Sequence, residues 1–419
     1  MKTLKIGVML LALLLAAMAI VPMVSANEQS SSNQLVTSNQ VGLEQAQSIA
    51  LFNARNLATA SPDFAGWESA TVRLSKTYYD LNDQVTAYAY DILINGNYAG
   101  YILVSATTEK FPVLEISKGK LPGYSSAKTP DSERSVNNFA SGKGLTISES
   151  KPVYLGVLSY YRKYSTVNKN GDKGPDTFVD EHTDAVVDLS NTSTNDQFTL
   201  DNKQAGKIPA DKKADIKAQW DKQRTLLSST NSDQRTALMN SIQTASTSNY
   251  IYDVPLFIQD SSHTGCSPMA SSMVVSYWST HGYSALPSAR DTLFPLLANA
   301  MGTSNWPQPG TTWPWDIDDG INTVFYSYTQ RSPAANDYLP GWSGFVSEIN
   351  AGRPFVLSMH NGGISVGGTR AYSDHSVAVA GYVSSTFNYI TIHDTWDGSN
   401  VHLLKDGSWD NIMATWVRP

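Results

Sequence analysis

The sequence contains a single cysteine, Cys266, and the residues after it favour a helix that begins there. From Pro268 onward apolar residues recur at helical spacing, and a proline is tolerated in a first helical turn because its missing N–H has no helical partner anyway. The positive end of a helix dipole favours the thiolate, which is the nucleophilic form of cysteine. A lone cysteine cannot form an internal disulfide, so Cys266 is either a core residue or a working thiol, and we predict a nucleophile.

A nucleophilic thiol needs a general base, and His375 is the best candidate among the seven histidines. It opens an apolar run typical of a buried strand, and a second such run follows a short polar turn and ends near Asp394. A hairpin with its turn centred between positions 384 and 385 puts His375 directly opposite Asp394, whose carboxylate would orient the imidazole. A slip of one residue would bring His393 or Thr395 to that face instead.

Gln259 precedes the cysteine by seven residues, and its side-chain amide could donate to the oxyanion of a tetrahedral intermediate, beside the Cys266 backbone N–H. His263 is the main rival base because it lies three residues from the cysteine, and His360 ends another strand-like run. Three further histidines are expected to face solvent: His182, His281 and His402.

The N-terminus has the layout of a secretory signal peptide, which we assign to residues 1–26. Lys2 and Lys5 precede an apolar stretch, and Val24-Ser25-Ala26 forms a small-residue cleavage site. We therefore expect a secreted protein, extracellular or in the cell envelope, with no stable membrane anchor after signal removal. Secreted proteins usually carry cysteines in disulfide pairs, which makes a lone cysteine more notable.

Composition predicts a globular protein, with 41% hydrophobic and 16% charged residues. The formal charge of −7 argues against a nucleic-acid partner. No metal or cofactor is expected, because the loop at residues 168–172 lacks the glycine and the glutamate of a calcium-binding EF-hand. We expect a monomer that binds a peptide or protein substrate.

The elements that must position these residues divide the chain into regions. After the signal, residues 27–41 are polar and expected to be disordered. Residues 42–120 predict a small α+β domain, with a helix over 42–58 followed by strands and an Asn95-Gly96 hairpin turn. Residues 121–249 form a connecting region with a helical stretch over 209–229. Residues 250–419 form the last domain, which holds eight of the ten tryptophans.

The last domain resembles the papain-like cysteine peptidases related to the bacteriocin leader-processing (double-glycine peptidase-like) family. The resemblance is carried by Gln259, residues 265–270, residues 374–377 with Gly381-Tyr382, and His393-Asp394. It implies an α+β fold in which a helix carrying the cysteine packs on an antiparallel sheet carrying the histidine and the aspartate. It also implies a nucleophile at Cys266, a base at His375, an orienting residue at Asp394 and an oxyanion donor at Gln259. This chain departs from the family in having Ser267 where glycine is usual, and no transporter segment is present, so a double-glycine leader substrate is not implied.

The preceding region is similar to the inhibitory pro-domains of streptopain-type peptidases, on residues 88–91, 100–106 and 112–116. This resemblance implies a precursor in which the N-terminal part covers the cleft and residues 121–248 hold the activation site.

Two other functions fit the same residues. A cell-envelope amidase would use the same Cys–His chemistry, and a non-catalytic binding module could share the scaffold. Three tryptophans could line a substrate groove or belong to the core: Trp306, Trp313 and Trp315.

Overall fold

The computed structural model describes residues 39–123, 130–182, 186–187, 210–228, 245–260, 262–303, 312–361, 365–366, 369–370, 373–396, 398–399, 401–409 and 411–419. The predicted signal peptide and residues 27–38 lie outside these ranges. The end of the segment expected to be disordered is instead paired, because Gln40 forms a bridge with Thr107 and Val41 is buried. None of the helices in the described ranges combines the length and hydropathy that a membrane span requires.

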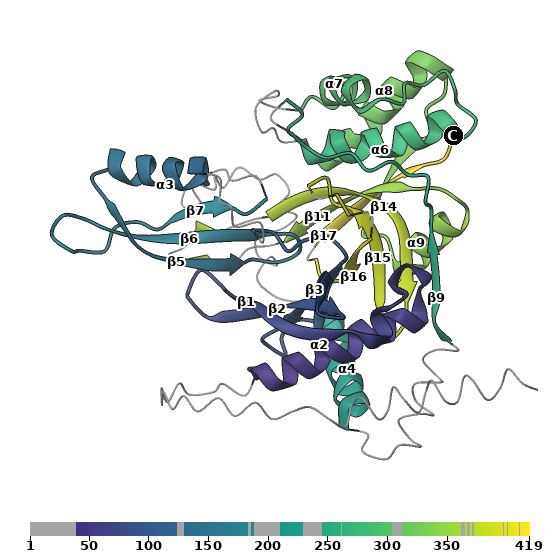
Figure 1. Cartoon of the computed structure of the whole chain (residues 1–419). Helices are drawn as coiled ribbons and strands as arrows, with labels where there is room; N and C mark the ends of the chain where they lie inside the picture. The colour runs from purple at the N-terminus through teal and green to yellow at the C-terminus, as the bar shows by residue number, and fades with distance from the viewer. Residues whose placement is uncertain are drawn as a thin grey trace, which may run out of the picture.

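A single, almost wholly antiparallel sheet of 15 strands runs through the N-terminal and C-terminal parts of the chain (Figure 1). Its order is β10-β17-β11-β14-β15-β16-β4-β3-β2-β1-β5-β6-β7-β8, with β9 paired to β14. The C-terminal strands are β9 (Thr247–Tyr250), β10 (Ala334–Tyr338), β11 (Phe355–Asn361), β14 (Ser373–Ser384), β15 (Asn388–His393), β16 (His402–Lys405) and β17 (Asn411–Val417). Two short strands, β12 (Ser365–Val366) and β13 (Thr369–Arg370), form a separate pair.

The N-terminal part has the predicted helix and strands. Helix α2 (Leu43–Ala60) packs on the sheet and shares its core, with the short helices η1 (Pro62–Phe64) and η2 (Trp67–Ser69) after it. The strands are β1 (Thr71–Tyr79), β2 (Val85–Ile94), β3 (Asn97–Ser105) and β4 (Val113–Ser117). The predicted hairpin turn is confirmed, because Asn95 and Gly96 both have positive φ, 51° and 79°, as a type I′ turn requires.

The connecting region extends the sheet. It contributes α3 (Pro130–Gly142), β5 (Thr146–Tyr154), β6 (Tyr160–Val167), β7 (Thr177–Asp180), β8 (Val186–Val187) and α4 (Ala210–Ser228). Helix α4 confirms the helical stretch predicted over residues 209–229. It lies against the N-terminal part, where the Trp220 indole donates to the Lys110 carbonyl at 2.7 Å.

Helices cover both faces of the C-terminal strands. Helices α6 (Cys266–Thr280), α7 (Arg290–Ala300) and α8 (Ile317–Thr329) lie together on one side of the C-terminal strands (Figure 1). They share a core with Ala378 and Ala380 of β14. Helix α9 (Trp342–Asn350) packs on the other face, with Val377 and Val379. This alternation along β14 is the two-residue period of a strand buried on both faces. The short helix η4 (Pro314–Asp316) precedes α8.

The sheet crosses the boundaries predicted between the N-terminal and C-terminal domains. Strand β4 pairs antiparallel with β16, and Ile116 lies opposite Leu403. The core of the N-terminal part also includes Tyr389 and Leu403 from the C-terminal strands. The two parts are therefore joined by backbone hydrogen bonds and by a shared apolar core.

Candidate functional site

The thiol of Cys266 lies at the first residue of α6, as the sequence predicts, and is partly exposed. Gly265, just before it, has φ of +153°, a conformation that residues with side chains rarely adopt. Pro268 sits in the first turn, and a Cβ on Gly265 would lie 3.1 Å from its Cγ. A glycine is thus needed for the sharp entry into the helix, and this entry puts the sulfur at the positive end of the helix dipole.

Helix α6 is tied to β14 by a hydrogen bond between the residues that follow Cys266 and His375. The hydroxyls of Ser267 and Ser376 lie 2.9 Å apart, and the Ser376 hydroxyl is also 2.9 Å from that of Ser358 on β11. Consecutive Cα atoms are about 3.8 Å apart, so Cys266 and His375 each lie one residue from this bonded pair. The bond therefore brings the backbone at Cys266 close to the backbone at His375. Ser267, the departure from the usual glycine, makes the connection.

Gln259 fastens the segment before the cysteine to the turn that follows β15. Its Oε1 accepts from the Gly265 backbone N–H at 2.8 Å, and its Nε2 donates to the Thr395 hydroxyl at 2.6 Å. Its backbone N–H donates to the Thr395 carbonyl at 2.8 Å. The Gln259 side chain thus lies beside the start of α6, where the sequence placed it.

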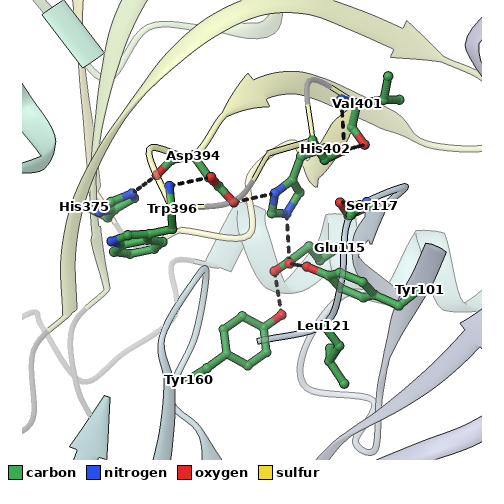
Figure 2. Close-up of polar contacts among 12 residues, drawn as sticks. Tyr101, Glu115, Ser117, Leu121, Tyr160, His375, Asp394, Trp396, Val401 and His402 are labelled. Carbon is green, nitrogen blue, oxygen red and sulfur yellow. Dashed lines mark hydrogen bonds and ion pairs between the residues drawn. The ribbon is translucent and has the colours of Figure 1, made fainter. Parts of the chain in front are cut away.

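His375 is buried on β14 and is held by the turn after β15. Its Nε2 lies 2.7 Å from the Asp394 backbone carbonyl oxygen, so this nitrogen must carry the proton. Its ring stacks on the Trp396 indole with centroids 3.7 Å apart (Figure 2). Burial lowers the pKa of His375 to about 4, against the opposing effects of the Asp394 carbonyl and carboxylate. The imidazole is therefore neutral at physiological pH, and Nδ1 is its basic nitrogen.

The predicted hairpin register is wrong. Strands β14 and β15 pair Ser384 with Asn388, so the turn is centred on Thr386, and a bulge at Ala380 shifts the register again before His393 pairs with Ala378. Continued, this register sets position 375 opposite 396 rather than 394, which agrees with the stacking of Trp396 on His375. His375 and Asp394 still meet, but through the Asp394 carbonyl.

The Asp394 carboxylate turns away from His375. Its Oδ1 accepts from the Trp396 backbone N–H at 2.8 Å, and its Oδ2 lies 3.0 Å from His402 Nδ1 (Figure 2). The residue between, Thr395, has φ of +74°, which is an outlier for a β-branched side chain. The bonds from Asp394 and Gln259 together hold this strained turn.

Two histidines predicted to face solvent are instead buried beside the site. The His182 ring, which follows β7, stacks on Trp396 with centroids 3.9 Å apart, so this indole stacks with two imidazoles. His402 is 1% exposed and bridges Asp394 and Glu115. Trp396 is distant in sequence from His182, and Glu115 is distant from His402, so spacing along the sequence carried no signal for these contacts.

The rival bases have other partners. The His263 ring pairs with Asp260, its Nδ1 2.9 Å from Oδ1, and lies edge-on to Phe294. His360 lies on β11, opposite Asp374. His393, the alternative that a register slip would have favoured, is fully buried and bonds Tyr250 and the Pro255 carbonyl.

The described residues contain no cluster of three or more histidine, cysteine or acidic side chains that could hold a metal ion. Trp313 and Trp315 stack with centroids 4.9 Å apart, and Trp315 is 39% exposed. Trp315 therefore lies at the surface rather than in the core, while Trp306 lies outside the described residues.

Comparisons with known proteins bear on the C-terminal part of the chain. No curated protein matches the sequence. A solved structure from Bacillus anthracis, assigned by its title to the C39-like peptidases, shares 13% identity and covers 41% of this chain and 98% of its own, with a TM-score of 0.29. Residues 251–418 match the model of the Peptidase_C39 like family, and this match supports a papain-like cysteine peptidase in the part of the chain that carries Cys266 and His375.

Proposed function

We propose that this protein hydrolyses peptide bonds, with Cys266 as nucleophile, His375 as general base and Asp394 as the residue that orients it. The observation that carries the proposal is the Ser267–Ser376 bond, which brings the backbone of Cys266, a partly exposed residue at a helix N-terminus, close to the backbone of His375. The family match over residues 251–418 supports the same chemistry.

In the proposed reaction, Nδ1 of His375 takes the thiol proton and the sulfur attacks the substrate carbonyl carbon. The Cys266 backbone N–H and Gln259 Nε2 stabilise the oxyanion that forms. An amide nitrogen carries two N–H groups, and the bond to Thr395 uses one of them. His375 then gives its proton to the leaving amine, and a water molecule hydrolyses the thioester in a second cycle.

We further propose that the protein is secreted as a precursor in which chain N-terminal to the catalytic part restrains the site, through the segment that carries His182. The signal-like N-terminus supports export, and the stacking of His182 on Trp396 supports restraint. A base with a pKa of about 4 is poorly matched to a thiol at neutral pH. Withdrawal of the segment that carries His182 would hydrate the Trp396–His375 stack and let the pKa of His375 rise towards its ordinary value.

The test compares the secreted chain with its Cys266→Ala variant, before and after limited proteolysis. We expect the wild type to cleave a denatured protein substrate, to bind a thiol-directed epoxide at Cys266, and to act faster after cleavage within residues 121–249. The variant should do none of these. A wild type that neither hydrolyses peptides nor binds the epoxide in either form would exclude the proposal. Epoxide binding combined with hydrolysis of cell-wall amides alone would favour the amidase.

A further inference from the structure

A buried charge network joins the turn that holds His375 to the N-terminal part of the molecule. Glu115, on β4, is 0% exposed and accepts hydrogen bonds from the Tyr101 hydroxyl on Oε1 and from the Tyr160 hydroxyl on Oε2, the latter at 2.8 Å. Its Oε1 also lies 2.9 Å from His402 Nε2 (Figure 2). Three polar groups that can each donate a hydrogen bond converge on its two oxygens.

His402 lies between two buried carboxylates, which favour its charged form. Its Nδ1 is 3.0 Å from Asp394 and its Nε2 is 2.9 Å from Glu115. A neutral imidazole has only one N–H and can donate to one of these two side chains, whereas the imidazolium can donate to both. Burial alone would lower the pKa of His402, but Glu115 and Asp394 raise it well above its ordinary value. The Tyr101 ring lies edge-on to the imidazole, with centroids 6.3 Å apart.

The network ends at the candidate base. The imidazolium fixes one oxygen of Asp394, and the other oxygen accepts from the Trp396 N–H and closes the turn. That turn presents the Asp394 carbonyl to His375 Nε2 at 2.7 Å and sets the Trp396 indole on the ring. The carboxylate therefore acts on His375 through the backbone that it holds.

We propose that His402 is a positioning residue of the peptidase centre, and that Glu115, from the N-terminal part of the chain, holds it charged and in place. The proposal rests on the proposed function. It implies that β4 is a part of the working enzyme, because Glu115 on this strand bonds His402, and His402 in turn bonds Asp394. Neither residue reaches the reacting atoms, so their loss should lower kcat with little change in KM.

Glu115→Gln keeps the shape of the side chain and removes its charge. We expect kcat to fall about 10- to 100-fold, the usual loss when a catalytic group is misplaced. With one carboxylate fewer, His402 loses its proton at lower pH, so the loss in kcat should be larger at pH 8 than at pH 6. His402→Gln carries no charge at any pH and should show a similar loss at both.

Asp91→Asn is the matched control. Asp91 is a buried carboxylate two strands away, on β2, and pairs with Arg73 at 2.7 Å. This variant should keep the kcat and the pH profile of the wild type. Wild-type kcat and pH profile in correctly folded Glu115→Gln and His402→Gln variants would overturn the proposal.

A second measurement needs no variant and no peptidase activity. Imidazole resonances of His402 in the wild-type chain should report a ring that keeps protons on both nitrogens well above the ordinary pKa of histidine. Titration of His402 near its ordinary pKa, about 6.5, would overturn the proposal even if the variants fail to fold. A wild type without Cys266-dependent hydrolysis would instead refute the proposed function, and the titration would still decide whether the buried network exists.

Discussion

At the scale of single residues, the candidate base is held by backbone and by aromatic rings. His375 Nε2 donates to the Asp394 carbonyl oxygen, and the imidazole stacks on the Trp396 indole. Burial lowers the pKa of His375 and keeps the ring neutral. His375 and Asp394 are in contact, as expected, but the Asp394 carboxylate bonds His402 rather than His375. Substitutions around His375 should therefore separate effects on the charge of its imidazole from effects on the position of the ring.

The low pKa of His375 makes the stability of the fold depend on pH. The pKa of His375 is about 4 in the folded chain and about 6.5 in an unfolded one, so between these values the unfolded chain binds more protons. The free energy of unfolding should therefore fall as pH drops from 6.5 to 4, by on the order of 3 kcal/mol from this group. His375→Gln should lack this part of the pH dependence. Parallel stability curves for the two proteins, measured by denaturant unfolding, would contradict the assignment.

Gln259 has two separable tasks, as a clamp and as an oxyanion donor. Gln259→Glu keeps an oxygen to accept from the Gly265 N–H but loses the N–H donors of the amide. We expect both Gln259→Glu and Gln259→Ala to lower kcat about 10²- to 10³-fold, the usual effect of losing one oxyanion donor. Gln259→Ala should also lower the melting temperature more, because it frees the loop. Wild-type kcat in Gln259→Glu would remove Gln259 from the oxyanion site.

At the scale of elements, the entry into α6 positions the thiol. Gly265→Ala forces a side chain into φ of +153° and brings its Cβ within 3.1 Å of Pro268, so the first turn and Cys266 must shift. We expect a loss of about 1–3 kcal/mol in stability and a slower reaction of Cys266 with iodoacetamide.

Gly282→Ala is the control at the other end of the same helix. Gly282 also has positive φ, +98°, but a Cβ there would meet nothing within 4 Å. This substitution should cost stability without changing the reactivity of the thiol. Equal thiol reactivity in Gly265→Ala and the wild type would show that the helix entry does not control Cys266.

The identity of these elements could be predicted, but their register could not. The helix at Cys266 and the strand at His375 follow from apolar periodicity, which is a local property. The bulge at Ala380 lies where β9 joins β14, and a Cβ on Gly381 would be 2.7 Å from the Asn249 carbonyl oxygen. The sequence of the β14–β15 hairpin alone does not indicate that β9 also pairs with β14.

At the scale of the whole molecule, the sheet that joins the two parts places Glu115 and His182 against the Asp394 turn. The sequence predicted two α+β units and a histidine, His402, on the surface. The structure buries that histidine because β16 pairs with β4, and strand pairs distant in sequence leave no periodic signal in either segment. The candidate nucleophile and base could be found from motifs, whereas the residues that support them could not.

The same pairing predicts the composition of the processed enzyme. Cleavage within residues 121–249 cuts the covalent connection, but β4 remains hydrogen-bonded to β16, and Tyr389 and Leu403 remain in the N-terminal core. We therefore expect the fragment carrying residues 39–120 to stay bound to the catalytic part after activation. Native size-exclusion chromatography should give a single peak, and intact mass measured after denaturation should show both fragments. An active C-terminal fragment that elutes alone would instead identify the N-terminal part as a detachable inhibitor and Glu115 as dispensable, because His402 would then hold Asp394 without it.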